Sequence, residues 1–164
     1  MTTWPQISID TDRGYSLCFG CGQKNPIGLK LSFQWDGKTA RAEFTPTKFY
    51  QGWAGFVHGG IVTAILDEAM GYAASSGGAN CVTASIQARL KRMALIDEPL
   101  IITSSITKKT RKLVKTKANI SLKDGTLIAE GTSTQFIFDN KAGRYKQHEE
   151  KSESNAQSIS TSQG

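Results

Sequence analysis

The chain has 164 residues, of which 38% are hydrophobic and 21% charged, and it contains 16 glycines and 3 cysteines. This is the length of one domain, large enough to bury a hydrophobic core without a disulfide or a metal ion. The composition excludes a collagen, a coiled coil and a chain that is disordered throughout. The longest nearly apolar run, residues 61–66, is far shorter than the ~20 residues that a membrane-spanning helix needs.

The amino-terminal residues lack a basic cluster followed by an apolar core, so we predict no secretory signal and a cytoplasmic protein without membrane attachment. An odd number of cysteines cannot form a closed set of disulfides. This favours a reducing compartment.

The formal net charge is +6, and the basic residues are concentrated in one part of the chain. Nine of them lie within residues 89–117: Arg89, Lys91, Arg92, Lys108, Lys109, Arg111, Lys112, Lys115 and Lys117. Such a stretch attracts anions, unless it is only a solvated strand face that keeps sheet edges from aggregating. Because residues 73–135 contain no aromatic side chain on which bases could stack, a small phosphate-bearing ligand is favoured over nucleic acid.

Period-two alternation of apolar side chains predicts a strand over residues 29–35 and a second strand over 40–44. Asp36-Gly37 between them is typical of a tight hairpin turn. One helix is predicted from Gly59 to about Ser75, and it is apolar nearly all round, so we expect it to be buried.

Further alternating segments predict strands over residues 82–91, 100–108, 113–122 and 126–138. Five or six strands and one helix indicate an α+β fold, in which an antiparallel sheet wraps around one long central helix. We expect residues 1–24 to be an irregular lead-in, residues 25–145 to form the domain, and the polar residues 146–164 to be disordered.

Two adjacent carboxylates, Asp67 and Glu68, lie in the apolar helix. Burying an ionised carboxylate is costly unless it is paired or hydrogen-bonded. Adjacent helical residues point about 100° apart, so the two occupy different surroundings. Asp67 shares a stripe of small residues with Gly60 that a ligand could approach. An ion pair with a basic strand residue is the alternative for both, and for Glu68 it is the preferred one.

His58-Gly59-Gly60 stands where the helix begins. The first turn of a helix presents free N–H groups and a partial positive charge, and glycines let a ligand atom come close. A carbonyl polarised there, with a carboxylate two turns deeper to activate water, is an arrangement suited to acyl transfer. His58 alone is more often a structural histidine.

The run HGGIVTAILD over residues 58–67 resembles the hotdog-fold acyl-CoA thioesterases of the PaaI-like type. The similarity extends to the order of elements over roughly residues 25–138. The segment CFGCGQKNPIGL over residues 18–29 is similar to one that recurs in a branch of these proteins.

The resemblance implies that Asp67, rather than Glu68, is the general base or nucleophile and that the Gly59 N–H polarises the thioester carbonyl. His58 would support the helix start or touch the thioester, and Thr83 would assist the water. Where some members carry a binding amide, this chain has Gly52, with Gln51 one position earlier. The remaining residues predicted for the substrate pocket, besides Gln51, are Trp53, Gly60 and Glu68.

The resemblance implies that the chain forms a homodimer or a dimer of dimers, with the active site between subunits. Pairing of two subunits would cover the sheet edge and the side of the helix that a single chain leaves exposed. The basic strands could then meet the phosphates of coenzyme A. The predicted contacts are Arg89, Lys91, Arg92, Lys109 and Arg111, with Lys108 and Lys112 as further candidates.

Cys18 and Cys21 have the spacing of a metal-ligand pair, but zinc prefers four ligands. Only Cys81, His58 and His148 remain to complete such a set, so we predict no metal site. A redox pair would need a βαβ context that this glycine-rich segment does not provide. We therefore favour a turn packed against the sheet.

These features predict a hydrolase that converts an acyl-CoA thioester to free acid and coenzyme A without metal or cofactor. The alternatives are a non-catalytic acyl-CoA binding protein on the same fold and, ranked third, an enoyl-CoA hydratase.

Overall fold

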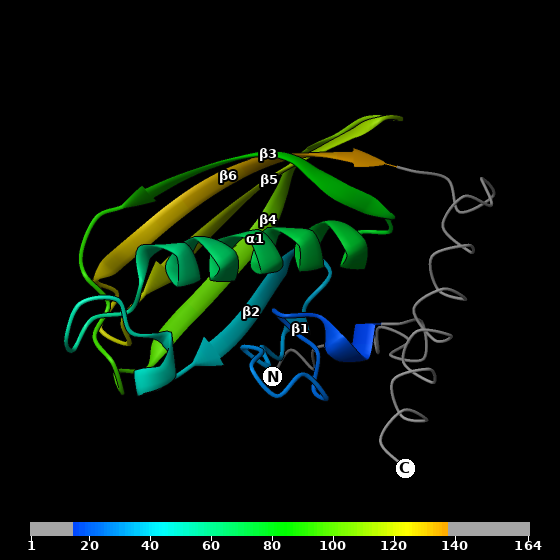
Figure 1. Cartoon of the computed structure of the whole chain (residues 1–164). Helices are drawn as coiled ribbons and strands as arrows, with labels where there is room; N and C mark the ends of the chain where they lie inside the picture. Colours follow the sequence, from blue (N-terminus) through cyan, green and yellow to red (C-terminus); the bar gives the residue numbers. More distant parts are fainter. Residues whose placement is uncertain (1–14, 138–164) are drawn as a thin grey trace, which may run out of the picture.

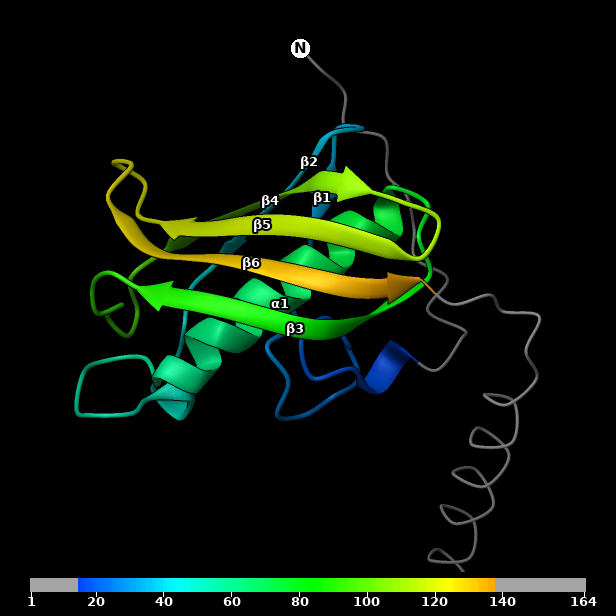
Figure 2. The ribbon, with the colours of Figure 1, turned by 90° about the horizontal axis from the view of Figure 1, so that it is seen from above.

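In the computed structural model, which describes residues 15–137, an 18-residue helix lies across one face of a six-stranded antiparallel sheet (Figures 1 and 2). The helix is α1 (Gly59–Ser76). The strands are β1 (Gln34–Trp35), β2 (Thr39–Phe44), β3 (Cys81–Leu90), β4 (Leu100–Lys109), β5 (Leu113–Ser121) and β6 (Leu127–Ile137), in the order β1-β2-β4-β5-β6-β3. The predicted fold class, an antiparallel sheet around one central helix, is confirmed.

The core lies between α1 and the concave face of the sheet. The helix contributes Val62, Ile65, Leu66, Ala69, Met70, Ala73 and Ala74, all buried. Buried residues alternate with exposed ones along β5, and its inward-facing Ala118 and Ile120 belong to the same cluster. Ser104 of β4 donates a hydrogen bond to the carbonyl of Ala69. The helix repeats every 3.6 residues and the strands every 2 residues, and both repeats place their apolar side chains in the layer between α1 and the sheet.

The helix is fully buried on the side that faces the sheet and half-buried over most of the rest, whereas the sequence predicted burial nearly all round. Gly60 is exposed, and Thr63, Asp67 and Gly71, which follow it on the same stripe, are half-buried. This stripe lies beside β3, the strand at one edge of the sheet (Figure 2).

The first predicted strand is shorter than expected. Leu29 and Leu31 are buried, as their alternation indicated, but their N–H groups donate to the carbonyls of Phe19 and Gly20 at 2.7 and 2.8 Å. Only Gln34–Trp35 pairs with β2. Residues 19 and 20 of the lead-in segment have taken the hydrogen bonds that a longer β1 would have used, and the described part of this segment lies on the side of α1 away from β3, β5 and β6 (Figure 1).

The carboxyl end of α1 is capped by a lysine. Lys109 Nζ donates to the carbonyl oxygens of Gly77 and Gly78, at 2.8 and 3.3 Å. A positive charge there opposes the partial negative charge of the helix end. Within the described residues, α1 and the short turns include no helix that could cross a bilayer. The predicted tail, residues 146–164, lies outside the described residues.

Candidate active site

The start of α1 holds one free backbone donor. His58 is the N-cap, and its Nδ1 accepts from the N–H of Gly60 at 2.9 Å, while its carbonyl accepts from Ile61 and Val62. Among the hydrogen bonds within residues 15–137, none uses the N–H of Gly59. His58 therefore organises the first turn, and the Gly59 N–H remains available to a carbonyl oxygen.

Asp67 accepts a hydrogen bond from the hydroxyl of Thr83, with Oγ1 and Oδ1 2.8 Å apart. No basic side chain within residues 15–137 lies at ion-pair distance from it. The structural ion pair that we considered as the alternative for Asp67 is therefore not observed in this part of the chain. The Thr83 hydroxyl is therefore the neighbour that orients this half-buried carboxylate.

A β-bulge directs Thr83 toward the helix. Thr83 pairs with Gln135 and Ser85 with Thr134, which leaves Ala84 as an extra residue. An extra residue reverses the faces that follow it. Thr83 therefore shares the helix-facing side with the buried Gln135, and Ser85 faces away. Without the bulge, the simple alternation of β3 would place the Thr83 hydroxyl on the outer face.

The two predicted catalytic groups are far apart within one chain. Gly59 and Asp67 are eight residues apart in a continuous helix, which corresponds to about 12 Å along the axis. One carbonyl group cannot contact both at hydrogen-bond distance. The pair can act together only if one member comes from a second copy of the chain.

Glu68 points to a different environment from Asp67, as their adjacency on the helix predicts. Its Oε2 lies 3.6 Å from the Sγ of Cys18, and no ion pair with a basic residue is found within residues 15–137. Half-burial, followed by the nearby Glu68 and Cys18, raises the pKa of the Cys21 thiol far above its ordinary value. The preferred expectation for Glu68, an ion pair with a strand, is therefore not met there. The thiols of the lead-in segment are its neighbours instead, which no local sequence pattern signals.

The basic residues predicted to meet coenzyme A fall into two groups at opposite ends of β3. Arg89, Lys91 and Arg92 lie at the end near the start of α1, since a Cβ on Gly59 would come within 3.1 Å of Leu90. Lys91 forms an ion pair with Glu130 at 3.1 Å. Lys109 and Arg111 lie at the other end, where Lys109 caps α1. Within one chain, these five basic residues therefore do not form a single cluster.

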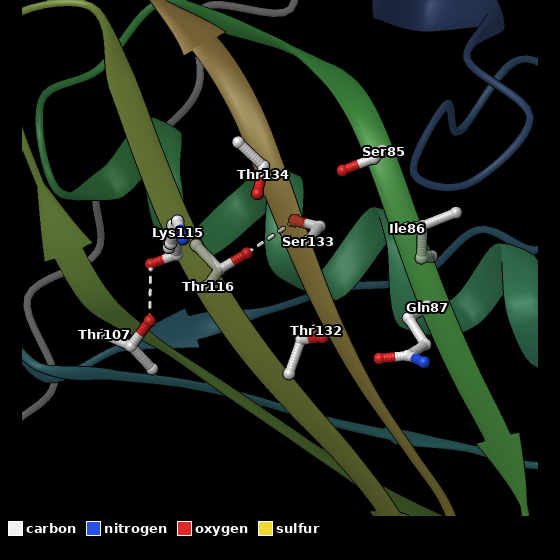
Figure 3. Close-up of a pocket in the computed structure, with 9 residues that line it drawn as sticks. All are labelled: Ser85, Ile86, Gln87, Thr107, Lys115, Thr116, Thr132, Ser133 and Thr134. Atoms are coloured by element: carbon white, nitrogen blue, oxygen red, sulfur yellow. Dashed lines mark hydrogen bonds between the residues drawn. The ribbon is translucent and has the colours of Figure 1, made fainter.

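The residues predicted for a substrate pocket lie mostly on the loop before α1. The side chain of Gln51 accepts from the N–H of Gly55 at 2.9 Å, so it supports this loop. Trp53 is 87% exposed. Neither forms a hydrogen bond with Asp67, whose side-chain partner within residues 15–137 is Thr83, whereas Gly60 lies on the same helix stripe as Asp67. A separate hollow has a volume of about 330 Å³. Its lining residues, drawn in Figure 3, come from β3, β4, β5 and β6 and include Ser85, Gln87, Thr107, Lys115, Thr132 and Thr134. None of the predicted site residues lines it.

Sequence and structure comparisons both show a similarity to thioesterases. Residues 54–129 match the model of the thioesterase superfamily. The chain has the hotdog fold of that superfamily. The predicted resemblance to PaaI-like hotdog thioesterases is thereby confirmed. No curated protein sequence matches the chain.

Three solved structures illustrate the similarity. A thioesterase superfamily protein is 28% identical, with a TM-score of 0.66; the match covers 71% of this chain and 58% of that protein, so this chain spans little more than half of its length. The E. coli PaaI protein of the phenylacetic acid degradation operon is 18% identical over 68% of this chain and 81% of its own, with a TM-score of 0.63. A hypothetical thioesterase from Streptococcus pneumoniae TIGR4, crystallised with coenzyme A, is 19% identical over 62% of this chain and 80% of its own, with a TM-score of 0.60. At these identities the last two show a shared fold.

Proposed function

We propose that the protein hydrolyses an acyl-CoA thioester to the free acid and coenzyme A, in a site built by two copies of the chain. The observation that carries the proposal is the half-buried Asp67 carboxylate, which holds the Thr83 hydroxyl and has no cation within residues 15–137. It lies on a helix whose first turn keeps a free N–H.

The thioester chemistry assigns each group a step. Asp67 accepts a proton from the attacking water, whose oxygen bonds to the carbonyl carbon. The negative charge that develops on the carbonyl oxygen is stabilised by the Gly59 N–H and the helix dipole. When the carbon–sulfur bond breaks, the proton passes from Asp67 to the departing thiolate. Thr83 fixes the orientation of the carboxylate.

The relatives support the substrate class and the carboxylate–hydroxyl pair. A Streptococcus mutans protein of the same fold was crystallised with acetyl CoA. The S. pneumoniae thioesterase was crystallised with an aspartate and, separately, a threonine replaced by alanine, and these two positions are 16 residues apart. Asp67 and Thr83 are also 16 residues apart and share a hydrogen bond.

The exposed edge of β3 supports a two-copy site. Val82 and Leu90 are 48% and 51% exposed on this strand, and the half-buried stripe of α1 runs beside it. An unpaired edge is a template for pairing with another strand. Antiparallel pairing of two β3 strands around a twofold axis would bring Gly59 of one copy toward Asp67 of the other.

The decisive assay is release of free thiol from short, long and aromatic acyl-CoA esters. Asp67→Asn is expected to lower turnover by ~10²–10⁴-fold, since it removes a general base. The matched control is Glu43→Gln, which changes an exposed carboxylate of β2 that pairs with Lys123. Equal activity of Asp67→Asn and the parent would overturn the proposal. Ligand-dependent thermal stabilisation without thiol release from any ester would instead indicate a binding protein.

Mixed dimers test the two-copy site directly. Gly59→Pro removes the N–H at the first helical position, where proline fits the helix. Each variant alone should be inactive, but a mixed dimer of Asp67→Asn and Gly59→Pro chains restores one complete site. No recovery of activity on mixing would place both groups of a site in one chain, against the 12 Å separation estimated from the helix rise.

A further inference from the structure

The lead-in segment and α1 bring together three groups that can ligate a metal. The Sγ atoms of Cys18 and Cys21 and a carboxylate oxygen of Glu68 all lie within 4.8 Å of one another. All three side chains are half-buried. They lie apart from the proposed catalytic groups, because Glu68 faces the lead-in segment and Asp67 faces β3.

The backbone holds the two cysteines in a tight turn against the helix. The N–H of Gly22 donates to the carbonyl of Cys18 at 2.9 Å, which folds both thiols toward Glu68. A side chain at Gly20 would overlap the Glu68 carboxylate, so a glycine there permits the close approach. The pairing of Leu29 and Leu31 with Phe19 and Gly20 anchors this turn to the core.

The Glu68 carboxylate has no basic partner within residues 15–137, and its neighbour there is the Cys18 thiol. Glu68 and the thiols face one another. Two thiols and a carboxylate that converge on one point, without an ion pair to a basic side chain of residues 15–137, offer three ligand atoms to a cation.

We infer that Cys18, Cys21 and Glu68 bind a Zn²⁺ ion, with water as the fourth ligand. Thiolates with one carboxylate suit zinc, whose ~2.3 Å bonds to sulfur and ~2.0–2.2 Å bonds to oxygen place tetrahedral ligand atoms ~3.5–3.8 Å apart. The present cluster needs only small side-chain movements to reach that spacing.

The inference reverses our sequence-based expectation of no metal. That expectation counted cysteines and histidines alone, whereas the third ligand is a glutamate 50 residues after Cys18. The ion would tie the lead-in segment to the turn of α1 that carries Asp67. It has no part in the hydrolysis that we propose, so each proposal can fail without the other.

The test uses the full chain, reduced and stripped of metal with a chelator, then titrated with Zn²⁺ against a chromophoric indicator. We expect one Zn²⁺ per chain and a higher melting temperature when it is bound. With Co²⁺ in place of Zn²⁺, we expect a thiolate-to-cobalt charge-transfer absorption band.

Substitutions separate this site from other binding. Cys18→Ser and Cys21→Ser should each weaken the charge-transfer band and the stabilisation by Zn²⁺. Glu68→Gln should weaken Zn²⁺ binding while the band persists, because both thiolates remain. Cys81→Ser is the matched control and should bind like the parent, since Cys81 donates to Gln135 elsewhere in the fold.

Two results would overturn the inference: no stoichiometric Zn²⁺ binding by the reduced parent, and full binding after Cys18→Ser and Cys21→Ser are combined. Circular dichroism of each metal-free variant shows whether a loss of binding reflects unfolding, and Glu68→Gln, which keeps both thiols, tests the site independently.

Discussion

Replacing Thr83 by valine removes the hydroxyl that donates to Asp67 and keeps the branched shape of the side chain. A hydrogen bond to a charged group contributes ~1.5–3 kcal/mol, and the lower end applies here because Thr83 is exposed in the single chain. Each ~1.4 kcal/mol corresponds to a tenfold change in rate. We therefore expect the turnover of Thr83→Val to fall about tenfold.

The assay is thiol release from the best acyl-CoA ester of the panel. Thr83→Ser keeps the hydroxyl and should recover most of the activity. Ser85→Ala is the matched control, because the bulge turns Ser85 to the opposite face of β3. Parental activity in Thr83→Val, or an equal loss in Ser85→Ala, would refute the role that we assign to the bulge.

Three further predictions concern stability. Gln135 is fully buried and donates to Ser133, so Gln135→Ala should lower the free energy of unfolding by about 3 kcal/mol in urea titrations; a loss below about 1 kcal/mol would contradict this. Lys109→Ala removes the cap of α1 and should cost about 0.5–1 kcal/mol by the same measurement, and no change would show that the cap is ineffective. The pKa of Cys21 is raised in the folded protein, so the unfolded chain loses this proton first when the pH rises above the ordinary value of 9.0. The free energy of unfolding of the metal-free protein should therefore fall above pH 9.0, and the same fall in Cys21→Ser would assign the effect to another group.

The helix and the long strands were predictable because an apolar period runs through most of each segment, even where a bulge interrupts it, as in β3. Five strands and α1 begin and end within about two residues of the predicted bounds. The exception is the segment before β1, where alternation correctly predicted that Leu29 and Leu31 are buried but not that Phe19 and Gly20 would be their backbone partners. Periodicity indicates which side of a segment is buried and does not identify the neighbour.

The site was predictable only in part, for two physical reasons. Asp67 could be singled out because burying an ionised carboxylate in an apolar helix costs free energy unless the group is paired or hydrogen-bonded. The face occupied by Thr83 depends on a single extra residue, Ala84, which a period-two pattern does not reveal. The partner of Glu68 is a turn about 50 residues away, and the balance between ion pair and thiol contact is decided by tertiary packing.

The lead-in segment affects how the protein could be shortened. The recognisable family match begins at residue 54, yet β2 forms the ladder beside β4, and Leu29 and Leu31 fill the main core cluster. A truncated version that starts at residue 54 would remove β2, one of the two strands paired with β4, together with the Leu29 and Leu31 side chains that help to fill the core. Such a fragment should aggregate, so the stretch that sequence searches detect is smaller than the unit that folds.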